Sequence, residues 1–331
     1  MIGLSAVAGK TKIPYPVLLV IVGMAVGFVP ALPKLELNPE IVFLIFLPPM
    51  LYDAAYNISP KEFRTNFNTI TTLAISLVFI TVIGIAVVAH YCIPGMTWPL
   101  SFVLGAILSA TDAVAAMSAT KGLGLPHKTI TILEGESLIN DASALIAYRF
   151  AVAAAMGTSF VLWKASWGFI VLLGGGLLCG FIIAWMMIYF LDKVKHNGQV
   201  VISLKLIMPF VTYSAAERLH VSGVIAVVTM GLSIAHYTGN LFSDAIKQQS
   251  KSVWEMIVFL LNGLVFILIG LQFPLVIKNI DSRHFLPYIG YSILIWLITL
   301  TVRTTRTFIH YHLSFCLDLG PDRLLFSIPI A

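Results

Sequence analysis

Long apolar stretches recur along almost the whole chain, and they are the feature that most restricts how it can fold. A helix that spans a membrane needs about 20 mostly apolar residues. Ten segments fit this description, and short connections carrying most of the charge separate them. The segments are 13–33, 40–57, 69–92, 99–120, 130–157, 168–191, 201–218, 221–239, 252–277 and 286–312. We therefore predict an all-α polytopic membrane protein.

Composition excludes most other classes of protein. Hydrophobic residues make up 59% of the 331 residues and charged residues only 11%, whereas a soluble domain carries about 25% charged residues. A soluble enzyme, a nucleic-acid-binding protein, a secreted disulfide scaffold and a disordered tail are all inconsistent with these values. The three cysteines are odd in number and widely separated, so they indicate neither a disulfide framework nor a metal site.

Lysine and arginine are distributed unequally between the two sides of the predicted membrane. The side with the N-terminus carries ten of them, namely Lys10, Lys12, Lys61, Arg64, Lys121, Lys128, Lys193, Lys195, Lys247 and Lys251. The opposite side carries five, namely Lys34, Lys164, Arg218, Lys278 and Arg283. Because basic residues accumulate in cytoplasmic loops, we predict that the N-terminus is cytoplasmic.

Ionisable residues inside the predicted spans are functional candidates, because burying charge in a bilayer is costly. Most of them fall in 110–113 and 133–141. A rise of about 1.5 Å per residue places Thr111 and Asp112 about 18 Å into their helix, and Asp141 about 17 Å into the next. These depths lie near the middle of a hydrocarbon core about 30 Å thick. Because the two helices are consecutive, we predict one shared polar site.

Spacing on the second of these helices indicates the chemistry of the site. Ser137 and Asp141 are four residues apart and share a face, which Glu136 and Asn140 flank. Carboxylate, hydroxyl and amide oxygens are ligands for hard cations such as Na⁺. No Cys or His joins the cluster, so zinc or copper is not expected.

Several of these residues have structural interpretations as well. Glu134 could cap its helix or be solvated near the predicted cytoplasmic end. Glu136 could pair with Arg303, which has a similar depth in the last predicted span. Asp112 could support a helix break as well as contact an ion. We expect Arg306 to extend towards the membrane surface.

Three further patterns receive structural interpretations only. Pro48–Pro49 predicts a kink or a break in 40–57. Tyr52–Asp53 matches part of an intramembrane aspartyl protease motif, but the second Asp, in a Gly-x-Gly-Asp setting, is absent. The glycines 174–176 have no following Lys or Ser/Thr, so they indicate close helix packing and not a phosphate loop.

The ordered set of motifs resembles the monovalent cation–proton antiporters of the sodium/hydrogen exchanger family. The resemblance covers about residues 12–312. The matching stretches are 13–18, 46–57, 110–112, 132–141, Glu217, 220–223 and 259–266. The most specific is Ile132-Leu133-Glu134-Gly135-Glu136-Ser137-Leu138-Ile139-Asn140-Asp141.

This resemblance implies an inverted-repeat transporter fold, in which two broken helices cross at the midplane and direct half-helix ends at the ion. It implies that Asp141 carries the exchanged ion and that Asn140 supports it. Ser137 and the Thr111–Asp112 segment would contribute to ion binding, with Na⁺ held by Asp141, Ser137 and Thr111. Glu136 and Arg303 would form a structural ion pair.

The implied activity is exchange of Na⁺, or of Li⁺ or K⁺, for H⁺. Burial disfavours the charged form of a carboxyl group and a nearby cation favours it, so the proton and the cation would compete for Asp141. An Asn before this Asp is the family's mark of electroneutral exchange. The resemblance further implies a homodimer in the plasma membrane, with no cofactor and no nucleic-acid partner.

Two departures from the family pattern leave an alternative open. Ala113 stands where the family usually has Pro after Thr-Asp. We also expect the chain to be one transmembrane domain over 1–331, truncated at both ends and lacking the family's C-terminal helices. The alternative is therefore a truncated or degenerate protein that does not transport. An ion channel is less consistent with a single tight carboxylate site.

Overall fold

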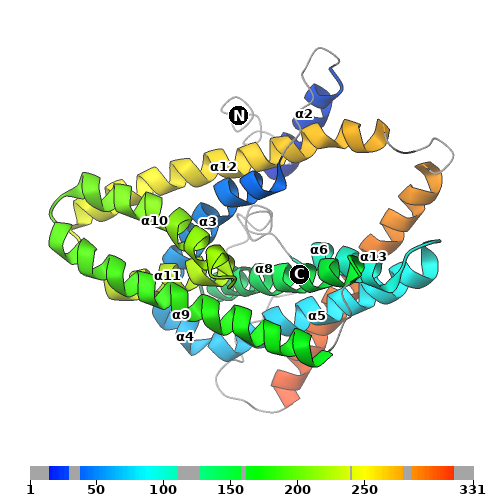
Figure 1. Ribbon diagram of the computed structural model, residues 1–331, viewed down its shortest axis with the longest axis horizontal. Coiled ribbons are helices and arrows are strands. Elements are labelled where there is room, and N and C mark those ends of the chain that lie inside the picture. The colour runs from blue at the N-terminus through cyan, green and yellow to red at the C-terminus, as the bar shows by residue number, and fades with distance from the viewer. Residues whose placement is uncertain are drawn as a thin grey trace, which may run out of the picture. The chain divides into compact units, whose positions relative to one another are not determined.

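All regular secondary structure in the described part of the chain is helical, as Figure 1 shows. The computed structural model describes residues 15–29, 38–110, 127–157, 162–238, 241–278, 280 and 285–316. Each of the ten apolar segments overlaps one helix. These helices are α2 (Tyr15–Gly27), α3 (Pro39–Asn57), α5 (Phe67–Cys92), α6 (Trp98–Ser109), α8 (His127–Ala155), α9 (Leu162–Val194), α10 (Gly198–Arg218), α11 (Gly223–Thr238), α12 (Asp244–Lys278) and α13 (Phe285–Cys316). The sequence analysis did not predict the short α4 (Pro60–Thr65).

Six helices among the described residues are long and apolar enough to cross a membrane. They are α5, α8, α9, α10, α12 and α13. The other four apolar helices, α2, α3, α6 and α11, are shorter. The predicted all-α membrane fold is therefore confirmed.

The described residues form two compact units. The first lies within Met1–Pro60 and Ser166–Arg283, and the second lies within Lys61–Ala113, Gly122–Ala165 and His284–Ala331. The expectation of a single transmembrane domain remains a prediction.

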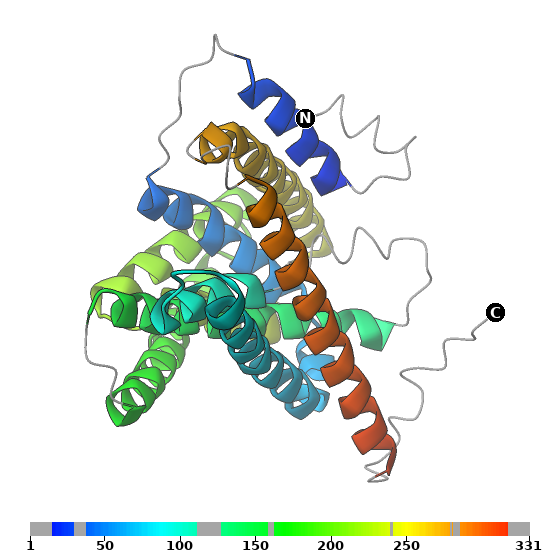
Figure 2. The same ribbon diagram turned by 90° about the vertical axis from the view of Figure 1, so that its right-hand side faces the viewer.

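Glycines bring helices of the first unit into backbone contact. α2 and α12 run side by side (Figure 2). A Cβ atom added at Gly23 would lie 2.5 Å from the Ile267 carbonyl oxygen, and one at Gly270 would collide with the Val20 carbonyl oxygen. Small residues at such crossings let helices approach closely in a membrane.

Close helix packing was predicted for the three consecutive glycines of α9, and the structure shows it at two of them. Gly175 faces the Val221 side chain, and Gly176 faces the carbonyl oxygen of Ser222. Gly174 has no atom within 4 Å of the place a Cβ would take. Two of the three glycines therefore bring α9 close to the start of α11.

The second unit is built around α5, α6 and α8. Its core contains Val78 and Val82 of α5, Ala106 of α6 and Ala144 of α8. A Cβ atom at Gly105 would lie 2.6 Å from the Val82 carbonyl oxygen, so α6 contacts the backbone of α5. This packing fixes α8 against α5 and α6.

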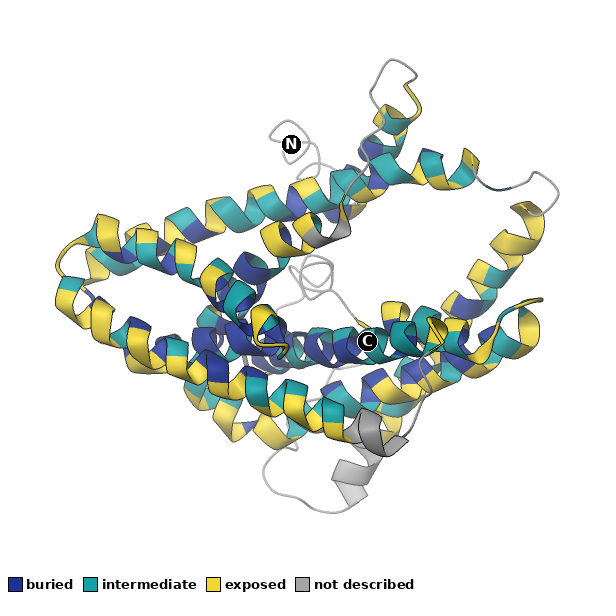
Figure 3. Ribbon diagram, in the orientation of Figure 1, coloured by how far each residue is buried: buried dark blue, intermediate teal, exposed yellow. Residues whose placement is uncertain are grey.

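Large apolar side chains cover the outer faces of several helices, and Figure 3 shows exposed residues along α9 and α13. Trp167 and Trp185 of α9 are each more than half exposed, as are Leu286 and Trp296 of α13. Contiguous apolar surface on this scale indicates a lipid environment.

Of the kink or break predicted at Pro48–Pro49, the break does not occur, because α3 continues from Pro39 to Asn57 with both prolines inside it. The kink remains a prediction. Each proline removes one backbone hydrogen bond, but helices in membranes tolerate this loss because neighbouring helices and local adjustments satisfy the freed carbonyl groups.

Candidate functional site

α6 ends in the middle of its predicted span. It begins at Trp98 and ends at Ser109, and Ala110 has an extended backbone with φ −72° and ψ 139°. Twelve residues of helix cover about 18 Å, which is little more than half of a hydrocarbon core. The helix therefore ends at this depth although Ala113, and not Pro, follows Thr111–Asp112. Thr111 and Asp112 themselves lie outside the described residues.

α8 carries the other predicted site residues on one continuous helix. Ser137 and Asn140 are buried, and Asp141 is half-buried. Gly135 lies one turn earlier, where an added Cβ would be 2.9 Å from the Ile70 side chain of α5. This glycine allows α8 to approach α5 just before the turn of α8 that carries Ser137, Asn140 and Asp141, which we call the polar turn.

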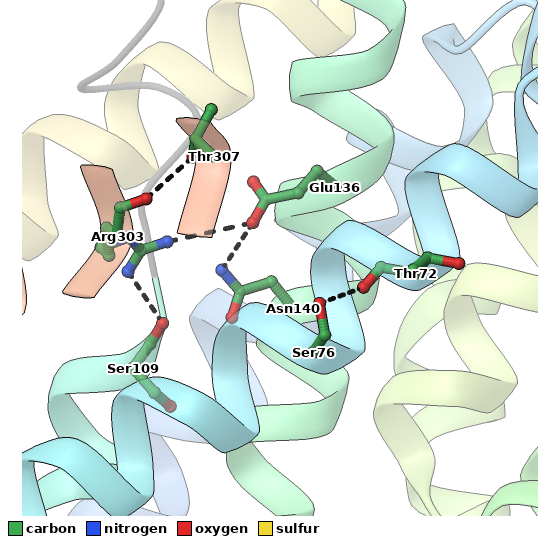
Figure 4. Close-up of polar contacts among 7 residues, drawn as sticks. All are labelled: Thr72, Ser76, Ser109, Glu136, Asn140, Arg303 and Thr307. Atoms are coloured by element: carbon green, nitrogen blue, oxygen red, sulfur yellow. Dashed lines mark hydrogen bonds and ion pairs between the residues drawn. The ribbon is translucent and has the colours of Figure 1, made fainter. Parts of the chain in front are cut away.

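Arg303 of α13 links α6 and α8, as Figure 4 shows. Its Nη2 lies 3.9 Å from Glu136 Oε1, and its Nη1 donates a hydrogen bond to the Ser109 carbonyl oxygen at 3.0 Å. The Glu136 and Arg303 side chains are only 14% and 18% exposed. The structure therefore brings together the two residues that were expected to pair.

Glu136 also contacts the neighbouring amide. Asn140 Nδ2 donates a hydrogen bond to Glu136 Oε1 at 3.2 Å (Figure 4). This contact holds the Asn140 amide in one orientation beside Asp141. One carboxylate oxygen of Glu136 therefore accepts the Asn140 hydrogen bond and faces the Arg303 guanidinium.

Arg303 provides a hydrogen-bond partner for a carbonyl group at the end of α6. The last carbonyl groups of a helix have no partner within the helix, and an unpaired buried carbonyl group costs free energy. The Arg303 guanidinium supplies a charged donor to the Ser109 carbonyl oxygen, and donors of this kind make the stronger hydrogen bonds. Arg303 therefore stabilises the end of α6.

The sequence analysis missed three residues that accept hydrogen bonds from other helices of the second unit. Ser109 was not singled out, although a helix ending before Thr111 would have exposed its carbonyl group. Glu62 of α4 accepts a hydrogen bond from Thr131 Oγ1 of α8 at 2.6 Å, and nothing in its sequence context marked it. Ser76 of α5 accepts a hydrogen bond from Arg306 Nη2 at 2.9 Å. Arg306, which was predicted to extend towards the membrane surface, contacts α5, against which α13 packs.

The chain matches a known family along most of its length. The family model described as "Sodium/hydrogen exchanger, transmembrane" matches residues 1–321. The "Sodium, potassium, lithium and rubidium/H(+) antiporter" of Bacillus pumilus is 37% identical over 300 residues, which cover 88% of this chain and 45% of the relative. The "Low-affinity Na(+)/H(+) antiporter NhaS1" of Synechocystis is 38% identical over 266 residues, covering 80% and 50%. The chain thus spans about half the length of the curated relatives it matches.

The fold matches solved structures as well. The sodium proton antiporter MjNhaP1 of Methanocaldococcus jannaschii at pH 8 superposes with a TM-score of 0.73 and 19% sequence identity. The match covers 91% of this chain and 72% of MjNhaP1. At this level of identity the likeness concerns the fold alone.

Proposed function

The chain belongs to the sodium/hydrogen exchanger family, whose members are membrane transporters and not enzymes, and from this membership we propose that it exchanges Na⁺, Li⁺ or K⁺ for H⁺. The observation that carries the proposal is the polar turn of α8 at the depth where α6 ends. There Asp141 follows Asn140, whose amide is held by the Glu136–Arg303 pair.

Asp141 is the proposed carrier of the exchanged ion. A carboxylate is costly in a medium of low dielectric constant unless a proton or a cation neutralises it. Ser137, one turn earlier on the same face, would supply a hydroxyl oxygen, and Thr111 and Asp112 would complete the site from the segment after α6. Na⁺ would be held by Asp141, Ser137 and Thr111.

Exchange follows if the site changes sides only when it is neutralised. A proton and a monovalent cation each neutralise one carboxylate, and they compete because both occupy it. One cation then crosses for each proton, which makes the exchange electroneutral. The neutral Asn140 beside Asp141 supports this stoichiometry, because a second Asp there would add another negative charge.

The range of cations is proposed to be broad. The Bacillus pumilus relative is named for sodium, potassium, lithium and rubidium. Oxygen ligands from a carboxylate and hydroxyl groups suit each of these hard cations.

We further propose that the protein is a homodimer in the plasma membrane with its N-terminus in the cytoplasm. The unequal distribution of Lys and Arg supports the orientation. Family membership supports the assembly and the membrane.

The proposal is tested by reconstituting the full chain in proteoliposomes that contain a pH-sensitive dye. Adding Na⁺, Li⁺ or K⁺ outside should drive protons across the wild-type membrane. We expect Asp141→Asn to abolish this movement for every cation, because an amide binds neither a proton nor a cation in exchange. If the rate of cation-driven proton movement does not change when a membrane potential is imposed, the result would support electroneutral exchange.

The matched control is Asp192→Asn, which removes an exposed carboxylate that pairs with Lys195. This variant should keep the wild-type rate. The melting temperature in detergent establishes that both variants are folded. Proton movement retained in a folded Asp141→Asn variant would refute the assignment of Asp141.

A further inference from the structure

A lysine is buried in the first unit. Lys205 of α10 is 1% exposed. Its Nζ donates a hydrogen bond to Tyr56 Oη of α3 at 2.8 Å. The same ammonium group lies 4.2 Å from the centre of the Tyr56 ring and 4.9 Å from that of Phe242.

Two further aromatic residues, Tyr52 and Trp254, are connected to Tyr56 by contacts between their rings, and both carry a hydrogen-bond donor without a partner. Tyr52 stacks on Tyr56 at 5.7 Å between ring centres and contacts Trp254 of α12 at 5.0 Å. Tyr52 is fully buried and Trp254 is 4% exposed. Neither the Tyr52 hydroxyl nor the Trp254 Nε1–H has a hydrogen-bond partner in the described structure.

The carboxylates next to Tyr52 and Trp254 in the sequence contact other side chains. Asp53 Oδ1 accepts a hydrogen bond from Asn57 Nδ2 at 2.9 Å. Glu255 lies 3.9 Å from Lys251. Within the described residues, the contacts of Lys205 are the Tyr56 hydroxyl and two aromatic rings, so its charge has no carboxylate counterion there.

The cluster therefore has an excess of donors and one positive charge. A lysine ammonium group has three donors and no acceptor, and the Trp indole is a donor only. The Tyr56 hydroxyl accepts from Lys205, which leaves its own proton to donate, and the Tyr52 hydroxyl can donate as well. A buried charge and buried donors are costly without partners. An anion would neutralise the lysine and accept hydrogen bonds from these donors.

We propose that Lys205, Tyr52, Tyr56 and Trp254 form a binding site for a small inorganic anion of the chloride class. Lys205, Tyr52 and Trp254 are buried and Tyr56 is half-buried, so a small anion fits this cluster better than a lipid headgroup or a large organic anion. The residues lie towards the end of α3 and towards the starts of α10 and α12, which is the end predicted to face the cytoplasm.

The test measures the melting temperature of the purified full chain in detergent while chloride replaces gluconate at constant Na⁺ concentration and ionic strength. The wild-type melting temperature should rise with chloride and saturate, because a ligand that binds only the folded state stabilises it. Lys205→Met, which keeps an unbranched side chain of similar length but removes its charge, should lose this dependence.

Lys193→Met is the matched control. Lys193 also lies over an aromatic ring, with its Nζ 4.3 Å from the centre of the Tyr189 ring, but it is exposed. This variant should respond to chloride as the wild type does. An equal chloride response in Lys205→Met and wild type, or no chloride response in the wild type, overturns the proposal.

A second variant keeps the test decisive if Lys205→Met does not fold. Tyr52→Phe removes one hydroxyl group that has no protein partner, so it should fold without loss of stability. Loss of one hydrogen bond to a charged ligand should weaken apparent chloride affinity about tenfold. Unchanged affinity in both Tyr52→Phe and Trp254→Phe would contradict the assigned donors. This test uses no transport assay, so its result is independent of the proposed exchange.

Discussion

Arg303 shows how one side chain can connect three helices. Its guanidinium reaches the carboxylate of Glu136 on α8 and the last residue of α6 at the same time. Arginine suits this position because its planar group presents several donors in fixed directions. A lysine at the same position would offer a single point charge and could not hold both partners in this geometry.

Replacing Arg303 should therefore destabilise the protein more than replacing Arg306, which makes one hydrogen bond to Ser76. In Arg303→Met the Glu136 carboxylate and the Ser109 carbonyl group lose their shared partner. Breaking a buried ion pair costs about 3 kcal/mol at the lower end of its usual range, and the 3.9 Å separation favours that lower end. The melting temperature in detergent measures the effect.

A double-mutant cycle separates the ion pair from its surroundings. Glu136→Gln combined with Arg303→Met should cost less than the sum of the single changes, because the double variant leaves no charge unpaired. Arg306→Met, which loses only the hydrogen bond to Ser76, should cost about 1 kcal/mol. Additive effects of the first two substitutions would mean that Glu136 and Arg303 are not coupled.

Glycines decide which face of α9 packs against other helices. Gly180 lies against the backbone of Ala226 in α11, so closely that an added Cβ would collide with its carbonyl oxygen. Cys179, Ala216 and Ala226 form a small buried core at this crossing. The outer side chains of α9 are large and exposed, which is appropriate for a helix that faces lipid.

This packing predicts opposite results for two identical substitutions on one helix. Gly180→Ala should lower stability by about 3 kcal/mol, the upper end of the cost of overpacking, because the backbone that it meets cannot move aside. Gly174→Ala places its methyl group in open space and should not lower stability, since Ala favours a helix more than Gly does. Melting temperatures of the two variants provide the measurement, and equal losses would mean that α9 does not cross α11 at Gly180.

At the scale of the whole molecule, charge orients the chain and apolar surface places it in the membrane. Lys and Arg concentrate on one side of the predicted bilayer, and the helices present large exposed apolar side chains between the charged ends. Translocating a loop rich in Lys and Arg is disfavoured, so the charge distribution decides the orientation before any tertiary contact forms.

The predicted orientation can be tested with the natural cysteines. α5 runs from the side that holds Lys61 and Arg64 to Cys92, which is exposed, so Cys92 should face the outside of the cell. A membrane-impermeant maleimide applied to intact cells should label the wild type. Cys92→Ser should abolish this labelling, because Cys179 is buried and Cys316 lies at the predicted cytoplasmic end of α13. Labelling of intact cells that persists in Cys92→Ser would contradict the predicted topology, because the end of α13 that holds Cys316 would then face outside.

The sequence alone determined the fold class and the positions of the apolar helices. Length and hydropathy suffice for this, because each spanning helix satisfies its own backbone hydrogen bonds and so depends little on its neighbours. The motif Glu136–Asp141 and the matching depth of Arg303 also sufficed to predict that an ion pair would connect two distant segments.

Only the tertiary structure decided the contacts that depend on how helices cross. That α3 continues through Pro48–Pro49, that Arg306 reaches Ser76, and that Lys205 is enclosed by aromatic side chains could not be read from local patterns. Each depends on neighbours more than ten residues away along the chain, which supply the partners, the space and the dielectric environment that a helix pattern by itself does not specify.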